Sequence, residues 1–484
     1  MNLAVLVGTV VLAGLLALAC PAGSARAAPE PLPLTPELRA QVDALVARAS
    51  GGEPGGAPAV AVALVAGGKL AYERAAGFAD LAARIPATTQ TRFRVGSITK
   101  MFTAVSVLQL AERHALALDD TLVRYLPWAP HAAAITLRQL LMHTSGLPNY
   151  LDEAFAADSV ATAATPRALI ETVAQRPLEF PPGTRYAYSN TGYVLLGLVV
   201  EAVAGEPLAD YERTHVFGPA RMRDTSVGAP PPEAPLALGY QDESGAAAQR
   251  FDPSWLYADG DAVSTAGDLA RFDIALMNGV LLGPQALAQM QAESVATGEG
   301  DERYGLGLSL APFGPLTLAG HHGGLPGFES DDELLLAKRS AIVVLSNAFT
   351  FRTSYLVSDL LAALFPAAFA ATIAGVKAEI VEIAPGEDFA VTALLRRFLD
   401  GLRSGCSDGS ELTAPLAAAL QAPGSASAAA RLAPLGELQS LVFRGRSERG
   451  DFSEYHYVGV FAAQRLPLTF VLDRNGKIAG LWIR

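Results

Sequence analysis

The sequence contains little cysteine, little charge and no basic run. Of its 484 residues, 17% are charged, and the formal net charge is -12 at pH 7. The lack of a Lys/Arg run argues against nucleic acid or an anionic membrane surface as the main partner. Hydrophobic residues make up 51% of the chain, so we expect a packed core rather than a disordered protein.

The N-terminus has the pattern of an export signal. Residues 3–19 form an uncharged apolar run, and small residues follow up to a cleavage site after Ala27. This predicts a signal peptide over residues 1–27 and an exported protein, periplasmic or secreted. Two alternatives are an uncleaved membrane anchor and a lipoprotein attached through Cys20. Cleavage would leave Cys406 as the remaining cysteine, so no intrachain disulfide is expected.

The main part of the chain, residues 28–372, is predicted to form one domain. Alternating apolar residues around Gly67 and Gly68 predict a two-residue hairpin that joins strands at 59–66 and 69–76. Further strand-like runs crowd between residues 305 and 347, and helical patterns occupy the middle. We therefore expect one sheet built from both ends of this region, with a helical block between them.

A second, smaller domain is predicted over residues 386–484. The stretch "PGED" marks its start, two helical patterns follow, and four strand-like runs complete it. This order indicates a separate α+β domain of the cystatin-like or nuclear-transport-factor-like type. Its segment "GCSDG" contains Ser407, which we interpret as a loop residue because the motif follows a helix rather than a strand.

A serine and a lysine share one face of a predicted helix that begins at Ser97. In "VGSITKMFTAVSVLQLAERHALALDD", Lys100 projects onto the apolar face, one turn after Ser97, and polar residues gather opposite it. A buried lysine is destabilised as an ammonium and can remove the serine proton, while the helix N-terminus helps an oxyanion. The alternative is that Ser97 caps the helix and Lys100 reaches water.

Two further motifs supply groups of matching chemistry. In "YAYSNTGY", Tyr188 is a strong base if cations lower its pKa from about 10, and Asn190 can hold the lysine and a substrate carbonyl. In "LAGHHGGLPGF", His321 is followed by Gly323 and Gly324, which let a substrate backbone approach, with the Gly324 N–H as a second oxyanion donor. The alternatives are a surface turn and a bulged strand.

The three motifs, in this order, resemble the serine beta-lactamase and penicillin-recognising family, in particular its class C beta-lactamase-like branch of esterases and DD-peptidases. The resemblance covers about residues 35–365. It implies an α/β lobe and an all-α lobe with the site at their junction. It further implies catalytic roles for Ser97, Lys100 and Tyr188, and substrate-binding roles for Asn190, His321, Gly323 and Gly324.

Three features depart from that family pattern or invite another reading. True beta-lactamases of this branch have lysine where His321 stands, and His321 is expected to be mostly neutral at pH 7.5 and cationic in mild acid. Asp259 and Asp261 fall in a segment that is usually small and glycine-rich, and we interpret them as solvated loop carboxylates. His143, in "LLMHTSGLP", is assigned a structural role.

The sequence thus predicts an exported serine hydrolase that forms an acyl-enzyme at Ser97 and releases it with water. The partner is a small-molecule or peptide acyl donor: a short ester, a D-amino-acid peptide or, poorly, a beta-lactam. The alternative is a penicillin-binding or sensor-type protein that acylates without turnover. No cysteine–histidine cluster has zinc spacing and no glycine-rich phosphate loop is present, so neither metal nor cofactor is implied.

Overall fold

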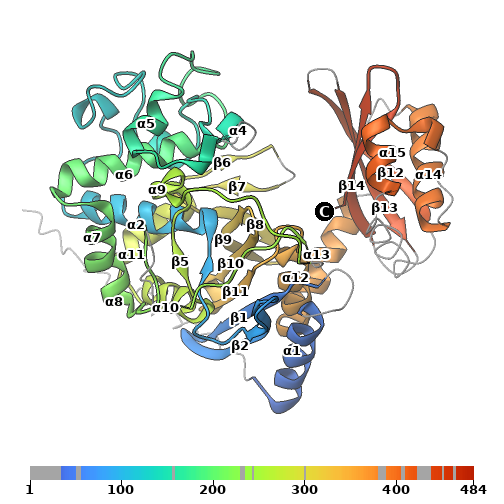
Figure 1. Ribbon diagram of the computed structural model, residues 1–484, viewed down its shortest axis with the longest axis horizontal. Helices are drawn as coiled ribbons and strands as arrows, with labels where there is room; N and C mark the ends of the chain where they lie inside the picture. The colour runs from blue at the N-terminus through green and yellow to red at the C-terminus, as the bar shows by residue number, and fades with distance from the viewer. Residues whose placement is uncertain are drawn as a thin grey trace, which may run out of the picture.

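The computed structural model describes eleven stretches of the chain, grouped in a large N-terminal unit and a small C-terminal one (Figure 1). The signal peptide, Cys20, the start of the "PGED" boundary, Cys406 and Ser407 lie outside them. The described residues are 34–50, 56–154, 159–228, 235–242, 245–298, 301–379, 388–404, 409–421, 438–449, 452–461 and 465–483.

A nine-stranded antiparallel sheet crosses the described part of the large unit, in the order β3-β2-β1-β11-β10-β9-β8-β7-β6. Val60 of β1 pairs with Ser346 of β11, so the N-terminal hairpin closes onto the late strands as predicted. The strands are β1 (Ala59–Ala66), β2 (Lys69–Asp80), β3 (Ile85–Pro86), β6 (Val295–Ala296), β7 (Arg303–Tyr304), β8 (Ser309–Phe313), β9 (Leu316–Leu325), β10 (Phe328–Leu335) and β11 (Ser340–Ser346).

Helices cover both faces of this sheet. Helices α1 (Pro36–Ala49) and α12 (Thr353–Leu364) pack on one face, and α10 (Ala266–Met277) packs on the other. Strand β1 is buried almost throughout, which explains its unbroken apolar sequence. Gly67 and Gly68 adopt φ values of 59° and 76°, the left-handed backbone that a tight hairpin turn requires.

The helical lobe is built around α2 (Thr99–Glu112) and α6 (Asn190–Ala204), which pack on each other and on α9 (Tyr257–Gly260). Helix α6 ends at Gly205 with φ 74°, as its sequence predicts. Further short helices complete the described lobe: α3 (Leu137–Leu141), α4 (Leu151–Ala154), α5 (Pro166–Glu171), α7 (Leu208–Glu212), α8 (Gly218–Ala220) and α11 (Pro284–Ala292).

Helix α2 differs from the two-faced helix that its sequence predicts. Every residue from Thr99 to Leu110 is buried, including the polar ones. The polar face is inside because its side chains find backbone acceptors: Thr103 Oγ1 donates to Ala258 O at 2.7 Å, and Gln109 Nε2 donates to Leu281 O at 3.0 Å. The nucleophile candidate therefore precedes a helix that is fixed on all sides.

The C-terminal unit has its own core. Helices α14 (Phe389–Ser404) and α15 (Ala414–Gln421) accompany an antiparallel sheet in the order β12-β13-β14-β15, with Leu395, Phe443 and Phe470 buried in the cluster. The predicted α+β content is present here. The strands are β12 (Leu438–Arg449), β13 (Phe452–Phe461), β14 (Arg465–Asp473) and β15 (Ile478–Ile483). Before this unit, α13 (Pro366–Glu379) runs past residue 372, the predicted end of the first domain.

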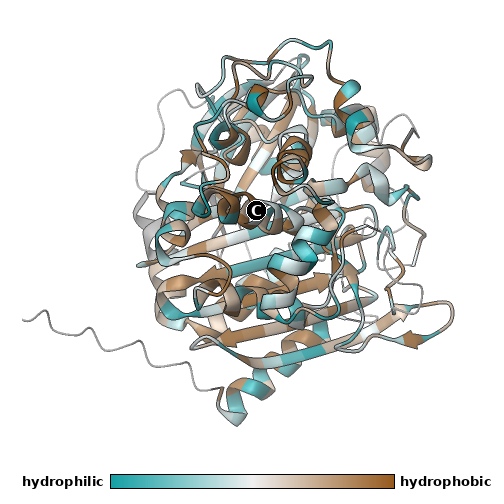
Figure 2. Ribbon diagram, turned by 90° about the vertical axis from the view of Figure 1, so that its left-hand side faces the viewer, coloured by the Kyte–Doolittle hydropathy of each residue, from teal (hydrophilic) through white to brown (hydrophobic). Residues whose placement is uncertain are grey.

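Apolar residues follow the strands of the large sheet and the helices packed on it, as the brown segments of Figure 2 show. Among the described residues, no single helix has the length and composition to cross a membrane, and two sharply bent helix pairs pass that test only when taken together.

Candidate active site

Ser97 lies in a short turn rather than at the start of the helix. Gly96–Ile98 forms one 3₁₀ turn, and α2 begins at Thr99. Gly96 has φ 52°, and a Cβ there would lie 3.2 Å from Gly324 N. Both the backbone conformation of the turn and the closeness of the neighbouring strand therefore favour glycine at position 96. The prediction that an α-helix begins at Ser97 was therefore wrong, because Ser97 lies in the 3₁₀ turn that precedes α2. The Ser97 hydroxyl makes no capping hydrogen bond.

Lys100 is fully buried and directed at Ser97. Its Nζ donates to Ser97 Oγ at 3.0 Å, to Asn190 Oδ1 at 2.7 Å and to the backbone oxygen of Asp259 at 2.6 Å. Burial lowers the pKa of Lys100 to about 8, against the opposing effect of the Asp259 carboxyl. Near neutral pH a useful fraction of this amine is therefore neutral and able to accept a proton.

Tyr188 donates its hydroxyl hydrogen to Ser97 Oγ at 2.8 Å. The residue is 36% exposed toward the cleft, and desolvation nevertheless raises its pKa well above the ordinary value. Lys100 Nζ lies 4.9 Å from the centre of the Tyr188 ring, and both groups hydrogen-bond to Ser97 Oγ. The condition for a phenolate base, a pKa lowered by cations, is therefore not met, and the raised pKa favours a neutral Tyr188 that donates its proton.

Tyr188 is supported by an aromatic cluster around His143. The His143 ring lies 4.3 Å from the Tyr188 ring and 4.6 Å from the Tyr304 ring, centre to centre. His143 Nδ1 accepts from the Ser189 N–H at 3.1 Å, and burial lowers the pKa of His143 well below its ordinary value. A neutral, structural histidine is what its sequence context predicts.

The Gly323–Gly324 stretch of β9 lies against the Ser97 turn. A Cβ on Gly323 would lie 2.1 Å from Val95 O and 3.0 Å from Ser97 N, so only glycine fits. Ser330 Oγ of β10 donates to Val95 O at 2.8 Å and to Gly323 O at 3.1 Å, which joins the turn to the sheet. The predicted approach of this strand to Ser97 is present in the structure.

His321 stays neutral in this site. Its Nδ1 donates to His322 O at 2.6 Å, and its Nε2 accepts from Tyr304 Oη at 3.0 Å, the tautomer that these partners require. Burial, assisted by the Lys100 charge, lowers the pKa of His321 to about 3. The expectation that mild acid makes His321 a cation was therefore wrong, because a tyrosine from β7 covers its ring.

His322 is the titratable cation of this strand, which the sequence analysis missed. Its side chain is half-exposed, and Nε2 meets Glu329 Oε2 at 2.5 Å. Burial favours the neutral form, but the hydrogen bond to Glu329 and the Asp331 charge prevail and raise the pKa of His322. The alternation of side chains along a strand could have predicted this difference, because the adjacent residues His321 and His322 point to opposite faces.

Asp259 and Asp261 are not solvated. Their residues are 1% and 6% exposed, because the segment forms α9 and packs on α2 and α6. Both Asp259 oxygens accept from Tyr150 Oη, at 3.1 and 3.2 Å, and Asp261 Oδ2 accepts from Gly228 N at 2.7 Å. Burial raises the pKa of each carboxyl to about 7, which overturns their interpretation as loop carboxylates.

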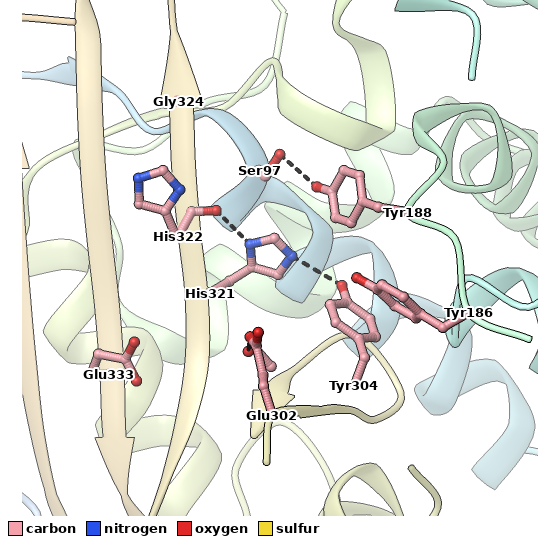
Figure 3. A pocket seen from close by; sticks show the side chains of 10 residues that line it. Ser97, Tyr186, Tyr188, Glu302, Tyr304, His321, His322, Gly324 and Glu333 are labelled. Carbon is pink, nitrogen blue, oxygen red and sulfur yellow. Dashed lines mark hydrogen bonds between the residues drawn. The ribbon is translucent and has the colours of Figure 1, made fainter. Parts of the chain in front are cut away.

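A cavity of about 360 Å³ opens beside Ser97 (Figure 3). Figure 3 shows Ser97 and Tyr188 at one end, with Tyr304 and Tyr186 on one wall and Glu302 below His321. No group of three or more His, Cys, Asp or Glu among the described residues has the geometry of a metal site. The lining residues are Ser97, Tyr186, Tyr188, Glu302, Tyr304, Ser309, His321, His322, Gly324 and Glu333.

A sheet covered by helices, with a serine, a buried lysine and a tyrosine in mutual contact beside it, defines a hydrolase of the beta-lactamase-related type. The chain belongs to the Beta-lactamase family, whose model matches residues 39–364. The suspected family and the α/β lobe with its helical partner are thereby confirmed.

Three known proteins illustrate the range of this similarity. Penicillin-binding protein 4* of Bacillus subtilis (strain 168) is 30% identical over 300 residues, 58% of this chain and 66% of that protein. Esterase EstB of Burkholderia gladioli is 34% identical over 233 residues, 41% and 59% of the two chains. The D-amino acid amidase of Ochrobactrum anthropi SV3, solved with L-phenylalanine amide, has a TM-score of 0.61 at 27% identity and covers 68% of this chain and 98% of its own.

Proposed function

We propose that the protein hydrolyses esters or amides through an acyl-enzyme at Ser97. The observation that carries this is the position of Ser97 Oγ, 3.0 Å from Lys100 Nζ and 2.8 Å from Tyr188 Oη. A serine hydroxyl in contact with both a depressed-pKa amine and a neutral phenol has a base to remove its proton and an acid to protonate a leaving group.

The proton path follows from the two pKa directions. Neutral Lys100 accepts the Ser97 proton while Oγ attacks the carbonyl carbon, and the oxyanion is held at the Ser97 and Gly324 backbone. Tyr188 gives its proton to the leaving oxygen or nitrogen as that bond breaks, and Lys100 returns a proton to Tyr188. Water then attacks the ester at Ser97, with the same groups working in reverse. Asn190 holds Lys100 and faces the substrate carbonyl in this scheme.

The substrate class we favour is a short ester or a D-amino-acid amide or peptide rather than a beta-lactam drug. Among the described residues that line the cavity there is no Lys or Arg, His321 is neutral and the titratable His322 is paired with Glu329, so a drug carboxylate has no permanent cation on this strand. An esterase and a D-amino acid amidase among the similar proteins agree with this preference. The second candidate is a penicillin-binding or sensor-type protein, which the likeness to penicillin-binding protein 4* favours.

We also propose that the protein is exported by the N-terminal signal and works in the periplasm or outside the cell. The C-terminal unit would then be an accessory domain of the cystatin-like type. Its helices and four-stranded antiparallel sheet support that type, and its core is separate from that of the catalytic unit.

The test is turnover of p-nitrophenyl acetate by the purified mature protein. We expect many turnovers per molecule and an acetyl group on Ser97 in the steady state, detected by peptide mass spectrometry. Ser97→Ala should lower kcat/KM by roughly three or more orders of magnitude. Ser354→Ala, on the exposed surface of α12, is the matched control. A single stoichiometric burst would support the sensor, and a Ser97→Ala protein with a tenth of wild-type turnover would refute the nucleophile.

A further inference from the structure

The cavity beside Ser97 has an unusual balance of charge for an acyl-transfer site. Its lining contains the two carboxyl groups of Glu302 and Glu333, and none of the described lining residues is Lys or Arg; His322, the titratable cation among them, is already paired with Glu329. The nearest buried cation, Lys100, already donates to Ser97, Asn190 and the Asp259 backbone. Glu302 and Glu333 are therefore the carboxyl groups in the lining that a bound cation could pair with.

The two carboxyl groups reach the cavity from different strands. Glu302 precedes β7 and accepts a hydrogen bond from Ser309 Oγ, which fixes one of its oxygens. Glu333 lies on β10 opposite Gly320, so β9 contributes no side chain that would cover it there. Burial and the charges of Asp331, Asp332 and Glu302 raise the pKa of Glu333 well above its ordinary value. A cation entering the cavity would relieve this repulsion and favour the ionised form of Glu333.

Aromatic rings form the opposite wall. The rings of Tyr186 and Tyr304 are 5.8 Å apart, and those of Tyr188 and Tyr304 are 6.5 Å apart. In Figure 3 the Tyr188 hydroxyl points to Ser97 and the Tyr304 hydroxyl to His321, with Tyr186 beside Tyr304. Aromatic faces attract a desolvated cation, and carboxylates opposite them complete a site that suits an ammonium group better than a neutral or anionic one.

We propose that Glu302 and Glu333 select substrates that carry an ammonium group, which they hold against the tyrosine wall while the scissile carbonyl lies at Ser97. This deepens the proposed function and rests on it. A substrate with a carboxylate in the same place would face two acidic groups, and the His322 cation in the lining is already paired with Glu329. The two glutamates are thus specificity-determining residues, and neither takes part in the proton transfers.

The experiment compares choline with its neutral isostere 3,3-dimethyl-1-butanol, and adds 3,3-dimethylbutyrate, an anion of similar size whose charge lies at the other end. Each competes with p-nitrophenyl acetate at constant ionic strength, and in parallel each is titrated against the thermal unfolding midpoint, which needs no turnover. We expect the inhibition constant of choline to be at least ~10-fold below that of the alcohol, with the butyrate weakest.

Substitutions test whether the preference for choline over the alcohol arises in the cavity. Glu302→Gln should reduce the choline-to-alcohol ratio to about 3-fold or less, and Glu333→Gln should reduce it in part. Asp301→Asn removes the same charge one position away, outside the cavity lining, and should keep the wild-type ratio. Equal binding of choline and the alcohol, or an equal loss of the ratio in Asp301→Asn, would overturn the proposal. If choline is preferred in the unfolding titration but the ester is not turned over, the ammonium site stands and the proposed hydrolysis fails.

Discussion

The imidazole of His143 is stacked on the phenol of Tyr188, with ring centres 4.3 Å apart and planes inclined by 34°. The same imidazole accepts the Ser189 N–H through Nδ1, at 3.1 Å. His143 therefore fixes both the ring and the backbone of the residue that is placed to protonate the leaving group. It acts through Tyr188 and has no contact with Ser97 in the structure.

Two substitutions separate these contributions. His143 has φ 54°, which Asn tolerates, so His143→Asn keeps an acceptor and removes the ring, whereas His143→Phe keeps the ring and removes the acceptor. We expect each to lower kcat for p-nitrophenyl acetate by about 10- to 100-fold with a smaller change in KM. The acidic limb of the pH–rate profile should not move, because Lys100 is unaltered. A profile displaced by a full pH unit would show that His143 acts as a proton carrier.

The pH dependence of activity should report Lys100. Because its neutral form is the base, kcat/KM should rise with pH through about 8, the value to which burial lowers the Lys100 pKa. The Asp259 carboxyl raises this pKa, so Asp259→Asn should displace the acidic limb to lower pH, by roughly one unit. Asp261→Asn is the matched control, since its carboxyl binds Gly228 N instead. An acidic limb that moves upward in Asp259→Asn would contradict a lysine base.

Stability should depend on pH through His322. Its pKa is raised in the folded protein by Glu329, so protonated His322 adds stability below the unfolded pKa of about 6.5, and this is lost as pH rises through the folded pKa. We expect His322→Gln to lower the Tm of the large unit by roughly 1–3 °C at pH 5.5 and by less at pH 9. His456→Gln, on β13 of the other unit, should not show this pattern. A larger deficit at pH 9 would exclude the His322–Glu329 pair as the cause.

The C-terminal unit should be dispensable for chemistry at Ser97. A chain that ends after Glu379 keeps α13, which packs on β8. If it remains folded by circular dichroism, its kcat/KM for p-nitrophenyl acetate should stay within about 3-fold of the full chain, because the described lining of the cavity comes from the large unit. A folded truncation that no longer acylates would show that the C-terminal unit completes the site.

The sequence predicts local backbone structure correctly where a single residue type, such as glycine, determines the conformation. The turn at Gly67 and Gly68 and the helix end at Gly205 follow from left-handed backbone that glycine adopts readily. The three motifs also meet as predicted, since Ser97, Lys100, Tyr188 and Asn190 are joined by hydrogen bonds.

Burial and its electrostatic consequences could not be predicted in the same way. The low pKa of His321 follows from burial and the Lys100 charge, and the Asp259 carboxyl is bound by Tyr150, so both depend on elements far away in the sequence. The hydropathy pattern predicts that Thr103 lies on the surface, whereas its hydroxyl is buried and donates to the backbone oxygen of Ala258. Hydropathy patterns assign a polar side chain to solvent, whereas the fold supplies it with a partner.

The pairing of β1 with β11 has a consequence for a chain that is still being synthesised. The turn that carries Ser97 follows the first hairpin, but its neighbour Gly324 is on β9, and the sheet is not closed until Ser346 meets Val60. Contacts of such long sequence separation form late and slowly. A chain that is still being made therefore carries Ser97 without the strand that places Gly324 beside it, and we expect no acylation until the last strand of the large sheet is in place.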